Sequence, residues 1–94
     1  MAITVKFLGA LRHISDVDEL AVESKDDISI KELIGEIVRG MPVLQKSLLP
    51  QQLEDLRSNT LILVNGKEIS VLKGLETNLK DGDEIVFVPF VHGG

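Results

Sequence analysis

Two glycines, Gly93 and Gly94, end the sequence and are its strongest candidate for a reacting group. Because glycine has no Cβ, two in succession can lie extended in a narrow channel and bring a terminal carboxylate to the catalytic groups of another protein. An ionised carboxylate is a poor electrophile, but an acyl adenylate carries a good leaving group that a sulfur nucleophile or an amine can displace. The sequence therefore favours a protein whose terminal carboxylate is activated and then transferred by other enzymes. Such a protein needs no catalytic residues of its own.

Other sets of reactive residues point to structure rather than chemistry. Cysteine is absent, which excludes disulfides, thiolate catalysis and iron–sulfur ligation, and the two histidines, His13 and His92, lie far apart, so we expect no metal site. His13 and Ser15 lie close in sequence without an orienting group, which is typical of a polar loop. Acidic residues cluster at 16–19 and 81–84, where we predict turns or an acidic rim facing a basic partner.

The composition is that of one small globular domain. The 94 residues are 44% apolar and 27% charged. Aromatic residues make up only 3% and the net charge is -5, which argues against direct binding of nucleic acid. The apolar runs are too short for a membrane span, and the N-terminus has no signal-peptide pattern, so a cytoplasmic location is expected.

Alternating and continuous apolar runs predict five strands. A half-buried strand over 3–8 pairs with 19–23 across a loop that has room for one helical turn. Asn65-Gly66 is the preferred two-residue turn between two later strands. The predicted strands cover 3–8, 19–23, 60–64, 67–70 and 84–90, with irregular chain over 71–78 and a turn at 81–83.

One long helix is predicted after the first hairpin. Ser29 and Glu32 have the spacing of a capping box. Apolar residues then recur at steps of three and four up to Met41, forming one buried stripe. We predict a left-handed C-cap at Gly40, and Pro42 prevents continuation. Residues 43–59 are expected to form a short helical piece on each side of Pro50.

This order of elements predicts an α+β fold of the β-grasp (ubiquitin-like) type. The expected roll is a mixed sheet of about five strands with one main crossover helix packed on one face. Residues 1–90 form the β-grasp domain, and residues 91–94 form a flexible C-terminal tail ending in Gly-Gly.

The first and last strands carry apolar residues on both faces, but a single helix covers only one face. An exposed apolar patch of this kind marks a binding surface. Cover by residues 43–59 or by a second copy of the chain is the alternative. We predict partner binding by the following residues: Leu8, Val86, Val88, Pro89, Phe90, Val91 and His92.

Three segments resemble the ubiquitin-like sulfur carriers of the MoaD/ThiS family. They are Val64-Asn65-Gly66-Lys67, the run from Leu79 to Pro89 with its Asp-Gly-Asp-Glu motif, and the terminal Gly93-Gly94. The opening residues 3–12 are similar to the small subunit of molybdopterin synthase.

The resemblance implies a carrier role for Gly94. An E1-like adenylating enzyme would use ATP and Mg²⁺ to activate the Gly94 carboxylate, and a persulfide donor would convert it to a thiocarboxylate. The carrier would then dock on the large subunit of molybdopterin synthase and donate sulfur to a pyranopterin, while Gly93 allows the approach. No cofactor is bound by this chain itself.

Two departures from the family pattern keep an alternative open. Phe90 follows Pro89 where a second proline is common, and His92 precedes the glycines. The His-Gly-Gly ending looks like the Urm1-type carriers, which serve tRNA thiolation and attach to protein lysines, as archaeal small modifier proteins do. The third hypothesis is a β-grasp interaction module without sulfur chemistry.

Overall fold

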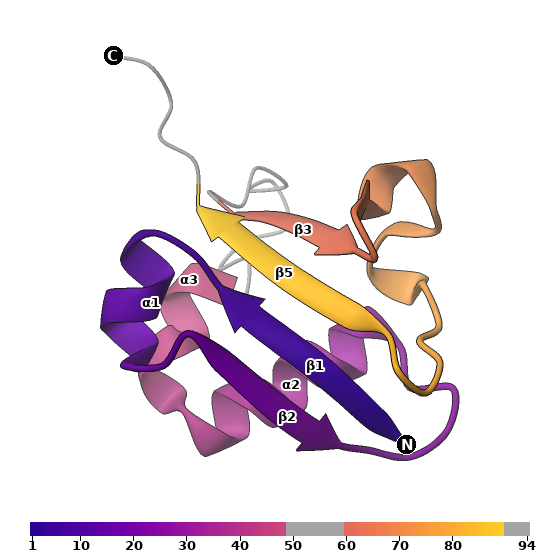
Figure 1. The fold of residues 1–94 in the computed structure, drawn as a ribbon, viewed down its shortest axis with the longest axis horizontal. Coiled ribbons are helices and arrows are strands. Elements are labelled where there is room, and N and C mark those ends of the chain that lie inside the picture. The colour runs from indigo at the N-terminus through magenta and orange to yellow at the C-terminus, as the bar shows by residue number, and fades with distance from the viewer. Residues whose placement is uncertain (49–59, 90–94) are drawn as a thin grey trace.

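The computed structural model describes residues 1–48 and 60–89, which form a mixed sheet covered on one face by helices (Figure 1). Five strands lie in the order β2-β1-β5-β3-β4. Strand β1 runs parallel to β5, and the other neighbouring pairs are antiparallel. The strands are β1 (Ala2–Phe7), β2 (Glu19–Glu23), β3 (Thr60–Val64), β4 (Lys67–Glu68) and β5 (Glu84–Pro89). This arrangement confirms the predicted β-grasp roll.

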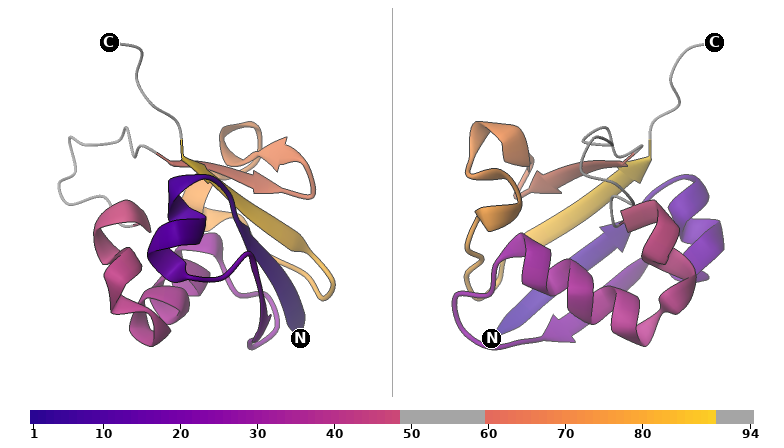
Figure 2. Two further views of the ribbon diagram at one scale, coloured as in Figure 1. Left: turned by 60° about the vertical axis from the view of Figure 1, so that its left-hand side comes forward. Right: turned by 180° about the vertical axis from the view of Figure 1, so that it is seen from behind.

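The α-helices within residues 1–48 and 60–89 lie on one side of this sheet, as the two views in Figure 2 show. The longest, α2 (Ile30–Gly40), runs across the sheet, and α1 (Ala10–Ser15) and α3 (Gln45–Leu48) lie beside it. Single 3₁₀ turns occupy Pro42–Leu44, Ile69–Val71 and Gly74–Glu76. The core between the layers is aliphatic apart from Phe7 and Phe87, whose rings stack with centroids 5.7 Å apart. None of the helices within 1–48 and 60–89 is long and apolar enough to cross a membrane.

Helix α2 begins as predicted but ends differently. The Ser29 hydroxyl accepts from the Glu32 N–H at 3.1 Å, and the Glu32 carboxylate accepts from the Ser29 N–H at 3.2 Å, which completes the capping box. The predicted left-handed cap at Gly40 is wrong, because Gly40 is the last helical residue and has no positive φ. Met41 leaves the helix instead, with φ −136°, since proline at position 42 disfavours helical backbone in the residue before it.

The β3–β4 hairpin turns at Asn65 and Gly66, which both have positive φ, as the sequence predicts. The predicted return strand over 67–70 is too long, because β4 ends at Glu68. The Glu68 carboxylate accepts hydrogen bonds from the N–H and the hydroxyl of Ser70, which closes a 3₁₀ turn in place of further ladder pairing. Hydrogen bonding to Ser70 also lowers the pKa of Glu68.

Two other segments agree with the sequence prediction where the structure describes them. The helical turn allowed in the loop before β2 is present as α1, whose Leu11 enters the core. The expected helical piece before Pro50 is present as α3, whereas the piece after Pro50 lies outside the described residues. Strand β5 is described up to Pro89, so Phe90 of the predicted strand also lies outside them.

Candidate functional site

The face of the sheet opposite the helices holds Val86 and Val88 of the predicted partner-binding surface, whereas Pro89 is half-buried beside Gly9. Along β5 the side chains alternate, with Ile85 and Phe87 fully buried under the helices and Val86 and Val88 half-buried on the other face. Leu8, one residue beyond β1, is 37% exposed, and its N–H donates to the Phe87 carbonyl at 3.1 Å. The predicted orientation of Val86 and Val88, away from the helices, is therefore confirmed.

Two leucines of β3 extend this surface. Leu61 lies opposite Val88 and Leu63 opposite Val86 in the antiparallel register, and both leucines are half-buried. We name the five residues the open-face patch: Leu8, Leu61, Leu63, Val86 and Val88. Sequence reasoning missed the leucines because residues 60–64 are all apolar or Thr and show no alternation. The signal was available, since a strand in a sheet with one helical layer must expose every second side chain.

The described part of the segment that could have covered this patch lies elsewhere. Leu44 and Leu48 are buried in the core on the helical side, together with α2. Their turn and α3 therefore cover the opposite face of the sheet (Figure 2). Residues 49–59 lie outside the described part of the chain.

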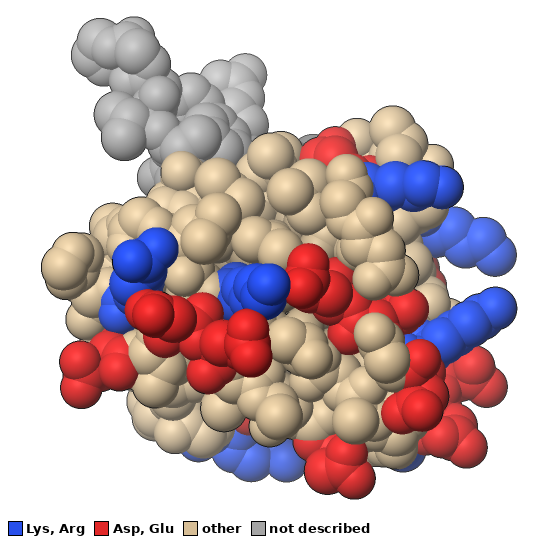
Figure 3. Space-filling view, viewed as in Figure 1, with Lys and Arg blue, Asp and Glu red and all other residues tan. Residues whose placement is uncertain are grey.

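Charged side chains border the open-face patch on the side of β1 and β2. Lys6 lies between Glu84 of β5, at 2.9 Å, and Glu19 of β2, at 3.9 Å. The hydrogen bond to Glu84 raises the pKa of Lys6 above its ordinary value. Figure 3 shows the contrast, with charged atoms over β1 and β2 and an uncharged area over the C-terminal half of β5. The surface thus divides into a polar half and an apolar half that ends where β5 ends.

The end of β5 is held by a contact that only glycine allows. Gly9 has φ 57° and ψ −135°, a backbone conformation that residues with a Cβ avoid. A Cβ on Gly9 would lie 3.0 Å from Pro89 Cγ, which is closer than normal contact. Gly9 therefore lets the chain after β1 approach Pro89 closely and fixes the point from which residues 90–94 continue.

The acidic motif after Leu79 acts as a structural turn at the opposite end of β5. The Asp81 carboxylate accepts from the Ala2 N–H at 2.7 Å, and Asp83 accepts from the Asn65 amide at 3.0 Å and the Lys80 N–H at 2.8 Å. These carboxylates tie the starts of β1 and β5 to the β3–β4 hairpin. The turn predicted at 81–83 is confirmed, and the carboxylates satisfy backbone and side-chain donors as turn residues do.

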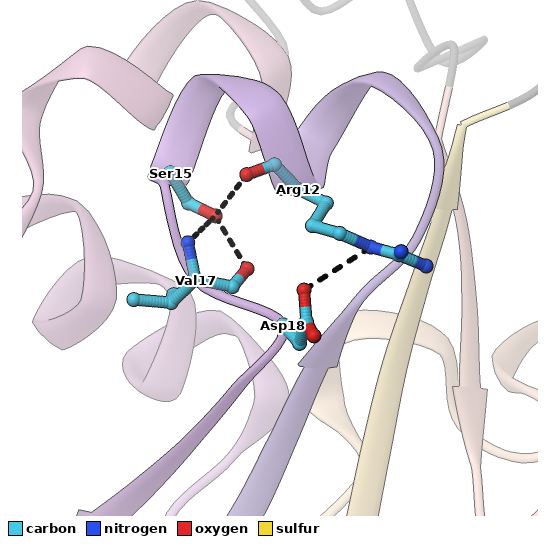
Figure 4. Close-up of polar contacts among 4 residues, drawn as sticks. All are labelled: Arg12, Ser15, Val17 and Asp18. Atoms are coloured by element: carbon cyan, nitrogen blue, oxygen red, sulfur yellow. Dashed lines mark hydrogen bonds and ion pairs between the residues drawn. The ribbon is translucent and has the colours of Figure 1, made fainter.

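Ser15, which the sequence places close to His13, also has a structural role. Figure 4 shows the Ser15 hydroxyl donating to the Val17 carbonyl at 3.0 Å and accepting from the Val17 N–H at 3.3 Å. Ser15 is buried and His13 is exposed. Beside them Arg12 and Asp18 form an ion pair at 3.3 Å. The hydroxyl closes the turn between α1 and β2 and is not directed at a histidine.

The remaining predicted site residues are not described. Phe90, Val91, His92, Gly93 and Gly94 lie outside residues 1–48 and 60–89. Within those ranges, no three His, Cys, Asp or Glu side chains lie close enough together to hold a metal ion. The described part of the candidate site is an apolar area of the open face that extends to the end of β5.

Comparison with known proteins identifies the family. The ThiS family matches residues 5–94. Ubiquitin-related modifier 1 of Schizosaccharomyces pombe is 30% identical over the full length of both chains. The structure of small archaeal modifier protein 1 from Methanosarcina acetivorans has a TM-score of 0.82 at 31% identity, covering 99% of this chain and 96% of that one.

A chain from the crystal structure of a protein complex is also similar to this protein. The crystal structure of the Amycolatopsis orientalis BexX/CysO complex includes a chain with a TM-score of 0.75 at 27% identity, covering 98% of this chain and 99% of that one. The family match spans nearly the whole sequence, and the β-grasp fold agrees with it. The chain therefore belongs to the ThiS family, and its resemblance to the ubiquitin-like sulfur carriers of the MoaD/ThiS type is confirmed.

Proposed function

We propose that this protein carries sulfur on its C-terminal Gly94 as a thiocarboxylate and delivers it to an acceptor bound by a partner protein. One observation supports this proposal most strongly. The open-face patch reaches the end of β5 at Pro89, and the sequence continues from there for five residues to Gly94. A partner that binds the patch also holds the base of the segment that carries the carboxylate.

The patch has the chemistry of a transient interface. Its five side chains are apolar, and Lys6 with its two glutamates forms a polar border on one side. Burial of apolar surface contributes about 25 cal/mol per Å², so a contact centred on Leu61 and Val88 contributes a few kcal/mol. Interfaces of this kind suit a carrier that must leave one enzyme and bind the next. The BexX/CysO complex of A. orientalis is a precedent for a partner protein.

The proposed charging reaction needs no catalytic residue from this chain. A carboxylate oxygen of Gly94 attacks the α-phosphorus of ATP, the α–β phosphoanhydride bond breaks, and pyrophosphate leaves. The terminal sulfur of a partner's persulfide then attacks the carbonyl carbon and displaces AMP. A thiol cleaves the resulting acyl disulfide, which leaves a thiocarboxylate on Gly94 and a disulfide on the donor. ATP and Mg²⁺ are bound by the E1-like partner in this scheme.

For the acceptor we propose the pyranopterin precursor of molybdopterin, bound by a larger synthase subunit. Residues 3–12 support this choice, because they are similar to the small subunit of molybdopterin synthase. Intact-mass measurement on protein purified from its own cells tests the carrier role. A species with one oxygen replaced by sulfur at Gly94 supports it. A sample without this species, under conditions where the molybdenum cofactor is made, overturns it.

A lysine modifier is the second candidate function. The relatives favour it, because full-length matches to ubiquitin-related modifier 1 and small archaeal modifier protein 1 are 30% and 31% identical. In this case the lysine ε-amine attacks the adenylated Gly94, AMP leaves, and an isopeptide bond forms. The last tryptic site of this chain is Lys80, so a modified lysine of a host protein would carry residues 81–94 after digestion. Such adducts, lost when Gly94 is deleted, identify this use.

A further inference from the structure

An apolar groove lies on the helical side of the molecule, between β2 and the C-terminal half of α2. Its volume is about 230 Å³, and its lining consists of Leu20, Val22, Glu36, Ile37, Gly40 and Met41. Leu20, Val22 and Met41 are half-buried, so their apolar surface is only partly covered by the core. The groove is separated from the open-face patch by the sheet and does not involve Gly94.

Strand β2 borders this groove with an unpaired edge. It is the first strand in the sheet order and pairs only with β1. Met1 and Ser24 exchange hydrogen bonds of 2.7 and 2.9 Å, and paired and unpaired positions alternate along an antiparallel ladder. In the observed register the N–H and C=O groups of Glu19, Ala21 and Glu23 therefore point away from β1. Within residues 1–48 and 60–89, β2 pairs with no strand other than β1.

Gly40 keeps the groove open where a side chain would fill it. Its φ is not positive, so the backbone does not require glycine, and a Cβ there would meet no atom within 4 Å. Neither the backbone conformation nor a neighbouring atom therefore requires glycine at this position, and the space beside Gly40 belongs to the groove.

The acidic residues around the groove favour a basic strand over a second copy of this chain. Glu19 and Glu23 flank the free edge on the open face, and Glu36 lies in the groove wall. A second copy pairing through β2 about Ala21 would place Glu19 of one copy opposite Glu23 of the other, and like charges directly opposite are destabilising. A strand with Lys or Arg at those positions pairs favourably instead.

We propose that the groove between β2 and α2 binds an extended segment of a partner protein in which apolar residues alternate with Lys or Arg. The segment adds to the free edge of β2 as a further strand. Its apolar side chains lie on the side of Leu20 and Val22 and enter the groove. Its basic side chains lie on the other face beside Glu19 and Glu23. Because the groove and the open-face patch are on different sides of the sheet, this segment binds together with a partner at the patch.

A synthetic peptide tests the proposal directly. A short capped peptide of alternating Lys and Val is titrated into the ¹⁵N-labelled full chain at low salt. Amide shifts are expected at residues 19–23 and 36–41, with no changes in the open-face patch. The matched Glu–Val peptide is expected to bind at least about tenfold more weakly, since like charges then face Glu19 and Glu23. Equal binding of the two peptides, or shifts confined to the patch, overturns the proposal.

Two variants of α2 separate blocking from unfolding. Gly40→Phe places a ring in the groove and is expected to lower the affinity for the Lys–Val peptide at least tenfold. Arg39→Phe, at an exposed position of the same helix outside the groove lining, is the matched control and is expected to retain binding. Wild-type affinity in folded Gly40→Phe overturns the assignment of the groove. Concentration-dependent shifts at β2 without peptide overturn the choice of occupant in favour of a second copy.

Discussion

The two faces of the sheet are built from the same strands but differ in how far their side chains are buried. On the helical face, Val5 and Phe87 are fully buried among aliphatic side chains. On the open face, their neighbours Lys6 and Val88 retain contact with solvent. Because side chains alternate along a strand, adjacent residues contribute separately to stability and to recognition. A substitution at position i and one at i+1 are therefore expected to change different properties of the protein.

The open face also differs from an ordinary solvated sheet face. Antiparallel sheets with one free face carry mainly polar residues on it. Here that is true of β1 and β2, whereas β3 and β5 keep Leu61, Leu63, Val86 and Val88. These side chains are half-buried, so folding removes only part of their apolar surface from water. Their concentration beside Pro89 agrees with the proposed binding of a partner at the open-face patch.

The largest expected effect is on the helical face. Ile34 belongs to α2, is 2% exposed and packs in the core. Ile34→Ala is expected to lower the free energy of unfolding by about 2–5 kcal/mol, because it leaves a cavity as well as removing apolar contacts. Urea denaturation followed by circular dichroism measures the change. Lys31→Ala, on the exposed side of the same helix, serves as the control and should stay within about 0.5 kcal/mol of the unaltered chain.

Much of this core was predictable from local sequence signals. The capping box at Ser29 and Glu32, the Asn65-Gly66 turn and the alternation along β1 each depend on residues close together in the chain. They identify where elements begin, turn and face the core. These signals sufficed for the fold, since the β-grasp roll follows from the order of the elements.

The features that the sequence did not predict depend on competing hydrogen bonds or on contacts between residues far apart in the chain. Glu68 accepts hydrogen bonds from Ser70 and ends β4 early, a competition that strand propensity does not contain. The outward position of Leu61 and Leu63 follows from their register with Val88 and Val86 of β5, about 25 residues later in the chain. The groove beside Gly40 depends on how α2 lies over β2, which the sequence pattern does not specify. The role of Gly93 and Gly94 stays a prediction from the sequence, because both lie outside residues 1–48 and 60–89.

A smaller effect is expected where the two faces meet, at Gly9. Gly9→Ala forces a Cβ into a backbone conformation that disfavours it and toward Pro89 Cγ at 3.0 Å. We expect a loss of about 1–3 kcal/mol in the free energy of unfolding. Gly35→Ala is the matched control, because its Cβ meets no atom within 4 Å and its φ is not positive. A Gly9→Ala protein as stable as Gly35→Ala would show that the contact with Pro89 does not hold the end of β5.

The open face gives the sharpest test of the separation between stability and recognition. Val88→Asp is expected to leave the unfolding midpoint nearly unchanged but to lower the rate of Gly94 charging by the activating enzyme about tenfold, equivalent to 1.4 kcal/mol. Ala21→Asp, on the same face but over β2, is the control and should charge normally. If the charging rate falls equally in both variants, the cause would be the added negative charge on the open face rather than the loss of apolar surface at Val88. A rate that falls in neither would remove the open-face patch from the activating interaction.

The smallest expected effect concerns the start of α2 and depends on pH. A hydrogen bond from the Lys25 ammonium, at 2.7 Å, and one from the Ser29 N–H lower the pKa of Glu32 below its ordinary value of 4.5. The unfolded chain therefore binds this proton more readily, so the contribution of Glu32 to stability is present above pH 4.5 and is lost as the pH falls through the lowered value. Glu32→Gln keeps an acceptor for the Ser29 N–H but carries no charge.

The urea midpoints of the unaltered chain and Glu32→Gln, measured between pH 7 and pH 3, isolate this contribution. The unaltered chain is expected to be slightly more stable at pH 7, and the difference should shrink as the pH falls below 4.5 and through the lowered pKa of Glu32. Because the Lys25–Glu32 pair is exposed, added salt should also reduce the difference at pH 7. Glu23→Gln, an exposed carboxylate on β2 outside the capping box, controls for the loss of one negative charge. A difference that persists unchanged at pH 3 would assign the effect to the shape of the amide rather than to the charge of Glu32.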